Sequence, residues 1–102
     1  MSLKKQFLKS KPVCKVTFRV SQEQVPDAET VHLVGDFNQW DKTAHPLTPL
    51  KNGDFKITID LDAEQKYAFR YLVDGQQWIN DDEPDALMNN GVTNDMNSVV
   101  EV

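Results

Sequence analysis

Apolar residues recur at every second position in three segments of this sequence, and that periodicity limits the fold more than any other feature. In 13–20 every second residue from Cys14 onward is apolar, with lysine, threonine and arginine between. Because successive side chains of a strand point to opposite faces, the pattern predicts a half-buried β-strand. Its buried face would consist of Cys14, Val16, Phe18 and Val20. The alternation recurs at 55–61 and 67–73, and no segment of useful length has helical periodicity, so an all-β chain is predicted.

Turn signals separate these segments. Asn52-Gly53 and Asp74-Gly75 are dipeptides that favour tight hairpins. Further short strands are predicted at 30–34 and 97–102, and 46–50 is expected to be at most an edge strand, because proline cannot donate to a central ladder. About six or seven short strands at this spacing predict an antiparallel β-sandwich, with a small barrel as the alternative.

Length and charge limit the domain count and the partners. The 102 residues accommodate one domain, and the net charge of −5 argues against nucleic acid, which binds basic surfaces. Because lysines crowd the first eleven residues, we expect 1–12 to be a flexible basic tail and 13–102 to be the folded domain. No apolar run has the length of a signal peptide or a membrane span, and Cys14 is the single cysteine. These features favour a cytoplasmic location and argue against a membrane partner.

The length of the hairpin loop at Asp74-Gly75 decides which face of the sheet carries Trp78. A loop of two residues would place Trp78 opposite Tyr71 in the core and would turn Asn80 inward. Burial of an asparagine without a hydrogen-bond partner is costly, which counts against this register.

A loop of three residues, 74–76, gives the other register. Trp78 then lies opposite Leu72 on the outer face, beside Arg70, while Ile79 turns inward. Because this arrangement buries an isoleucine rather than an asparagine, it is the preferred one, and Trp78 is predicted to be exposed.

Both tryptophans flank turns. Trp40 follows an apolar strand that runs into Gly35-Asp36, and Trp78 follows Asp74-Gly75. The face of an indole stacks well on the C–H face of a sugar ring, and polar side chains nearby can bind the hydroxyls at the ring edge. The candidates for that polar role include Arg70, Asn80 and Asn97. The pattern favours a carbohydrate site, and the alternative is that each tryptophan caps an end of the core.

An acidic cluster opens the stretch 81–96, which is expected to be long, polar and irregular. It contains Asp81, Asp82, Glu83 and Asp85. Paired carboxylates cleave glycosides, but they must face each other across a cleft and one must be desolvated. Four acids in a polar loop are more often solvated, and their spacing is not that of a known calcium loop. With His32 and His45 as the only histidines, no catalytic site, metal or cofactor is predicted.

Several ordered motifs together resemble one known family. They are VHLVGDFNQW at 31–40, GDF at 53–55, YAFRYLVDG at 67–75, then Trp78, and NSVV at 97–100. Over 13–102 the sequence is similar to carbohydrate-binding module family 48. That family includes the N-terminal early-set domain of isoamylases and branching enzymes, and the glycogen-binding domain of the AMP-activated protein kinase β subunit. The resemblance implies an immunoglobulin-like β-sandwich that binds α-1,4-glucan, as in glycogen and starch.

The resemblance also implies roles for individual residues. Trp40 and Trp78 would each stack on a glucose ring. Arg70, where kinase-type members have lysine, would bind hydroxyls, and Asn97 would add a further contact. Additional contact candidates are Asn80, Thr93 and Asp95. The loop just before Asn97 departs from the kinase-type pattern, which carries a leucine and a threonine there.

These features together predict a non-catalytic module that binds glycogen, malto-oligosaccharides or β-cyclodextrin. It would target or regulate a partner such as a glycogen-metabolising enzyme. The alternative is a protein-interaction module on the same fold, whose exposed tryptophans would anchor a protein interface. A glucan hydrolase or branching factor is the third candidate, for which no catalytic residues are predicted.

Overall fold

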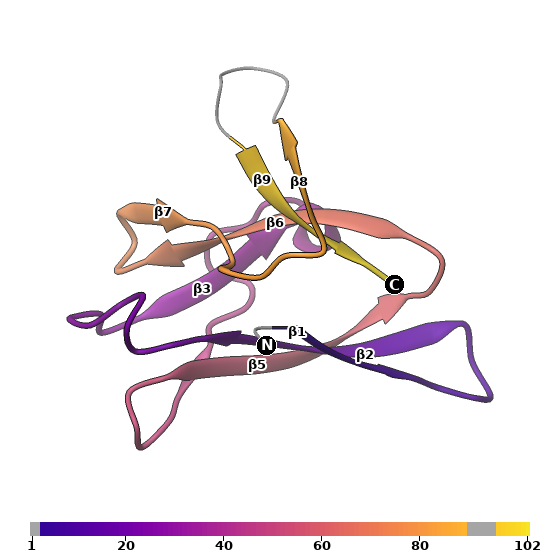
Figure 1. Cartoon of the computed structure of the whole chain (residues 1–102), viewed down its shortest axis with the longest axis horizontal. Helices are drawn as coiled ribbons and strands as arrows, with labels where there is room; N and C mark the ends of the chain where they lie inside the picture. Colours follow the sequence, from indigo (N-terminus) through magenta and orange to yellow (C-terminus); the bar gives the residue numbers. More distant parts are fainter. Residues whose placement is uncertain (1–2, 90–95) are drawn as a thin grey trace.

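The computed structural model describes residues 3–89 and 96–102, which form two antiparallel sheets packed face to face (Figure 1). The first sheet has the strand order β1 (Leu3–Phe7), β2 (Val13–Val20), β5 (Phe55–Asp62), β4 (Thr48–Pro49). The second has the order β3 (Val31–Gly35), β6 (Lys66–Val73), β9 (Met96–Glu101), β8 (Ala86–Asn89), and β7 (Gln77–Ile79) also pairs with β6. A short 3-10 helix, η1 (Asp36–Asn38), follows β3. The predicted all-β antiparallel sandwich of the immunoglobulin-like, early-set type is confirmed.

The core lies between the sheets and is built from the side chains that alternation marked. The inward residues of β2 are fully buried, as predicted: Cys14, Val16, Phe18 and Val20. Phe18 packs edge-on against Phe69 of β6, with ring centroids 5.1 Å apart, and Phe69 contacts Tyr71 at 5.7 Å. Burial of side chains of this size stabilises the fold by roughly 1.5–3 kcal/mol each. β6 is therefore a well-anchored support for whatever lies on its outer face.

The N-terminal segment differs from the prediction of a flexible tail. Leu3–Phe7 is an edge strand that pairs with β2 in the register Leu3↔Phe18. Leu3 is buried, and Nζ of Lys5 lies 2.6 Å from Oδ2 of Asp85, which directly precedes β8 of the other sheet. The lysines made this strand resemble a polar tail in the sequence. Exposed edge strands commonly carry charged side chains, lysine above all.

β8 is a second difference, because it lies inside the stretch 81–96 that was predicted to be irregular. It pairs with β9 in the register Met88↔Asn97. All four of its side chains are exposed. Such a strand forms through backbone pairing without a buried face, so hydrophobic alternation could not reveal it. Together β8 and β9 make a hairpin that projects beyond the sandwich (Figure 1).

β6 changes its partner halfway along one edge. The segment 66–69 pairs with β9 and the segment 71–73 pairs with β7, while β3 occupies the opposite edge. Arg70 lies between the two ladders. We call the region around Arg70, where the pairing of β6 with β9 ends and its pairing with β7 begins, the junction. Beyond it β9 continues with β8 as its partner.

Candidate functional site

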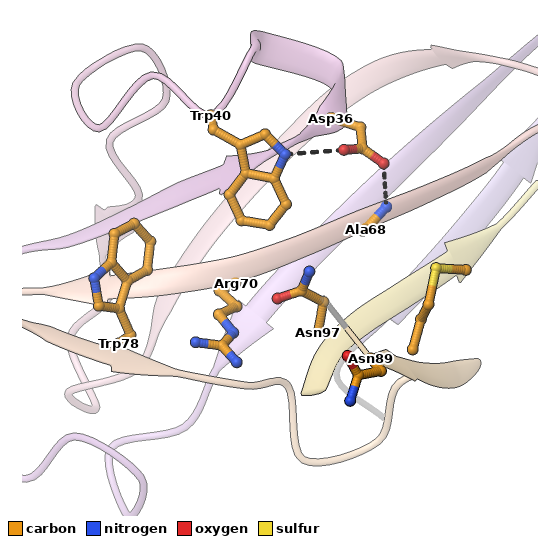
Figure 2. Close-up of a pocket in the computed structure, with 8 residues that line it drawn as sticks. Asp36, Trp40, Ala68, Arg70, Trp78, Asn89 and Asn97 are labelled. Atoms are coloured by element: carbon orange, nitrogen blue, oxygen red, sulfur yellow. Dashed lines mark hydrogen bonds between the residues drawn. The ribbon is translucent and has the colours of Figure 1, made fainter. Parts of the chain in front are cut away.

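A groove of about 460 Å³ lies on the outer face of the second sheet, at the junction (Figure 2). The described residues that line it are Asp36, Trp40, Ala68, Arg70, Trp78, Met88, Asn89 and Asn97. In Figure 2 the Trp78 ring and the two asparagines lie on opposite sides of Arg70, and the Trp40 ring lies above β6. The fold thus brings Trp40, Trp78, Arg70 and Asn97 from separate segments to one place.

The hairpin between β6 and β7 turns Trp78 into this groove. Trp78 lies opposite Leu72 and Ile79 lies opposite Tyr71, which confirms the predicted loop of three residues. The Trp78 side chain is 39% exposed, as that register requires. Nζ of Lys42 lies 6.0 Å from its ring centroid, at the limit of cation–π attraction. Trp78 is therefore presented outward, with a cation from another loop beside it.

Trp40 is held in an uncommon backbone conformation. Gln39 and Trp40 have φ angles of 54° and 57°, in the left-handed region that bulky residues rarely adopt. The backbone N of Trp40 donates to O of Gly35 at 2.9 Å, which closes the turn. Strain at such a residue costs on the order of 1–3 kcal/mol and persists where surrounding contacts impose it, often at binding sites.

Asp36 fixes the direction of the Trp40 ring. Its Oδ1 accepts a hydrogen bond from Nε1 of Trp40 at 2.9 Å, and its Oδ2 accepts one from the backbone N of Ala68 at 2.9 Å (Figure 2). Hydrogen bonds to a charged group contribute about 1.5–3 kcal/mol. One carboxylate therefore ties the indole to the central strand β6.

Asn38 supports the Trp40 loop, residues 36–45, from beneath. It is 7% exposed. Its Oδ1 accepts from N of Gly35 at 3.1 Å, and its Nδ2 donates to O of Leu33 at 3.0 Å. Nδ2 also lies 2.8 Å from Nδ1 of His45. Because an amide nitrogen is a donor, the imidazole nitrogen is the acceptor in this pair. A buried amide thus joins both ends of the loop that carries Trp40.

Arg70 and Asn80 converge on one carbonyl at the junction. Nη2 and Nε of Arg70 donate to O of Met96 at 2.6 and 3.2 Å, and Nδ2 of Asn80 donates to the same oxygen at 2.9 Å. Oδ1 of Asn80 accepts from N and Oγ of Ser98 at 3.0 and 2.9 Å. Asn80, an expected additional contact, is not among the described residues that line the groove. Its amide binds β9 instead.

Asn97 enters the groove from β9, directly opposite Met88 of β8. Paired residues of an antiparallel ladder lie on the same face, so both side chains project toward the groove. Met88 is 51% exposed and adds an apolar surface to this wall. The two other expected contacts, Thr93 and Asp95, lie outside the described residues.

The acidic segment corrects one expectation. Asp81 is buried rather than solvated, and its Oδ2 accepts from the Tyr71 hydroxyl at 2.6 Å. Because Ile79 points inward, the residue two positions later points the same way and meets the buried hydroxyl. Burial, with the Asp81 charge as a second cause, raises the pKa of Tyr71 well above its usual value. Asp81 therefore anchors the segment after β7, whereas the other three acids are exposed as expected.

Two further properties of the described residues bear on the kind of site. Within 3–89 and 96–102 no three His, Cys, Asp or Glu side chains gather in a way that could hold a metal ion. None of these residues belongs to a helix long and apolar enough to cross a membrane.

Sequence reasoning missed several residues of the groove and its surroundings. The sequence placed Asp36 only in the turn that Trp40 flanks, although an acid four residues before a loop tryptophan is a signal that could have found the Asp36–Trp40 bond. Met88 and Asn89 lie on the strand that alternation did not reveal. Lys42 reaches Trp78 from a distant segment, a contact for which no local pattern exists.

Comparison with known families gives a match that spans most of the chain. A family described as the glycogen recognition site of AMP-activated protein kinase matches residues 17–102. The matched region includes every described residue that lines the groove. The resemblance found in the sequence motifs is confirmed by this match.

Curated relatives match over shorter segments. The 1,4-α-glucan-branching enzyme of Dictyostelium discoideum is 53% identical over 38 residues, which is 37% of this chain and 6% of the enzyme. The enzyme of the same name from Saccharomyces cerevisiae is 44% identical over 52 residues, 38% of this chain and 7% of the enzyme. That of Aspergillus oryzae is 42% identical over 40 residues, 39% of this chain and 6% of the enzyme. The chain thus spans 6–7% of the length of these relatives.

Proposed function

Since the chain belongs to the family of the AMP-activated protein kinase glycogen recognition site, we propose that its groove binds α-1,4-glucan by stacking glucose rings on Trp40 and Trp78. The observation that carries this proposal is the convergence of two tryptophans, from segments far apart in sequence, on one groove that also holds Arg70 and Asn97. Indole faces match the C–H faces of sugar rings, while guanidinium and amide groups match their hydroxyls.

Arg70 would have a double role in this arrangement. Its Nε and one Nη2–H are directed at the Met96 carbonyl. A guanidinium carries five N–H donors, so further donors remain for glucan hydroxyls. The same side chain would thereby hold the junction and bind the ligand.

The interaction energies point to weak binding. Each stacked aromatic contact contributes about 0.5–1.5 kcal/mol beyond area burial, and each net hydrogen bond about 1 kcal/mol. These gains must offset the entropy that the glucan loses on binding. We expect a Kd on the order of micromolar to millimolar.

Titration with maltoheptaose or β-cyclodextrin, followed by tryptophan fluorescence, tests the proposal. Ligand should quench the emission of the wild type, and Trp40→Ala and Trp78→Ala should each abolish retardation in a glycogen-containing gel. Phe7→Ala is the matched control, because Phe7 is a 58% exposed aromatic on the other sheet. Retardation of both tryptophan variants to the wild-type extent would refute the assignment.

We also propose that the module is non-catalytic and directs an associated enzyme of glycogen metabolism to its substrate. Incubation with amylopectin should release no reducing sugar and form no new branches. The competing function, a protein-interaction module, would be favoured if glucans left the fluorescence unchanged while a defined partner bound the wild type and not Trp78→Ala.

A further inference from the structure

We propose that Asn80 is a positioning residue of the groove, which sets the place of Asn97 by holding the backbone of β9 on both sides of it. This inference rests on the proposed glucan binding. It differs from a ligand contact, since Asn80 is not among the described residues lining the groove. It would act through β9 alone.

The geometry of the amide carries the argument. Nδ2 of Asn80 donates to O of Met96 at 2.9 Å, one residue before Asn97. Oδ1 accepts from N and Oγ of Ser98 at 3.0 and 2.9 Å, one residue after it. Both polar atoms of one side chain are therefore used to hold the peptide units that flank Asn97.

The hydrogen bonds from Asn80 act on β9 at the junction. The ladder between β6 and β9 ends at the pair Phe69↔Ser98, so β6 does not pair with Met96 or Asn97. β7 occupies the same edge of β6 from Tyr71 onward, and Asn80 is the first residue after β7. Asn80 thus spans the gap between the end of one ladder and the strand that leaves it.

The consequence for the groove follows from the register of the hairpin. Asn97 pairs with Met88, and both line the groove. If the peptide units around Asn97 shift, the amide and the thioether move together, whereas Trp40 and Trp78 stay on their own supports. Loss of Asn80 should therefore displace Asn97 and Met88 and leave Trp40 and Trp78 in place.

Asn80→Asp is the first test variant, because it keeps the acceptor for Ser98 and replaces the donor that faces the Met96 carbonyl. The affinity for maltoheptaose should fall by roughly three- to tenfold, the equivalent of one hydrogen bond. Gln76→Glu is the matched control, since it makes the same amide-to-carboxylate change at an exposed residue of the same hairpin. Its affinity should remain that of the wild type.

A double-mutant cycle with Asn97→Ala separates positioning from direct contact. If Asn80 acts through Asn97, Asn80→Asp should lower the affinity much less in the Asn97→Ala background than in the wild type. Additive losses would overturn the inference. Asn80→Ala, which introduces no charge, repeats the cycle if Asn80→Asp fails to fold, and the same two outcomes decide. Absence of maltoheptaose binding by the wild type would instead contradict the proposed function.

Discussion

The two walls of the groove are built in opposite ways. The Trp40 loop is fixed through its side chains, with Asp36 on the indole and Asn38 buried beneath the turn. The β8–β9 hairpin exposes every side chain of β8 and is held at the junction through the backbone of β9, by donors from Arg70 and Asn80. The Trp40 loop is therefore preorganised at the expense of backbone strain, whereas the position of the β8–β9 hairpin depends on hydrogen bonds to its backbone. Preorganisation lowers the entropy lost on binding, so the Trp40 wall should supply most of the affinity.

Gly35→Ala should have the largest effect, because it disturbs the start of the Trp40 loop. A Cβ on Gly35 would lie 2.6 Å from O of Ala68 and 2.8 Å from Cβ of Phe69, both on the central strand. The φ of −172° is extended and open to alanine, so the cost arises from the contacts alone. We expect unfolding in urea to show a loss of about 1–3 kcal/mol or more in stability.

Gly75→Ala is the control for that substitution. Its φ of 69° is unfavourable for alanine, but a Cβ there has no neighbour within 4 Å. The expected cost is about 1–2 kcal/mol. A loss for Gly75→Ala larger than that for Gly35→Ala would show that the contact between β3 and β6 does not fix the start of the Trp40 loop.

Asp36→Asn should loosen the indole and leave the fold in place. The carboxylate accepts from Nε1 of Trp40 and from N of Ala68, and an amide has only one oxygen to offer these two donors. We expect the affinity for maltoheptaose, measured by fluorescence titration, to fall by roughly three- to tenfold.

Asp41→Asn is the matched control for Asp36→Asn. Asp41 lies in the same loop and accepts from N and Oγ1 of Thr43, away from the groove. The removal of its charge should leave the affinity unchanged. Equal losses in both variants would mean that loss of negative charge, rather than release of Trp40, lowers the affinity.

The same contrast explains which parts of the fold and of the groove the sequence alone could predict. Alternation in 13–20 and the choice of a buried Ile79 over a buried Asn80 were enough to predict the sandwich and the outward Trp78, because burial leaves a periodic pattern. β8 has no buried face, and Leu3 is the one buried residue of β1, so neither strand gave a pattern. Asp81 was assigned to solvent because its partner, Tyr71, lies on another strand.

Contacts between distant segments account for what sequence reasoning missed in the groove. Asn80 was expected to contact the ligand as a polar side chain near the tryptophans, but its amide meets a carbonyl and a serine of β9. Likewise, Lys42 meets Trp78 only because the loop after β3 and the strand β7 lie beside the same groove. Such pairings depend on register across strands, which alternation constrains for β6 and β7 and leaves undetermined for β9.

Met88→Ala should have the smallest effect and sharpens the comparison most. Met88 faces the groove, whereas its neighbour Leu87 lies on the opposite face of β8, and the two side chains are almost equally exposed, at 51% and 54%. Leu87→Ala is thus a control that removes a similar apolar surface from the wrong face. An exposed apolar contact on the β8–β9 hairpin contributes less to the affinity than a stacked aromatic ring. Met88→Ala should therefore weaken maltoheptaose binding by about two- to threefold. Leu87→Ala should not weaken it. Losses for Met88→Ala as large as those for Trp40→Ala would reverse the ranking, and the hairpin rather than the Trp40 loop would then be the wall that supplies the affinity.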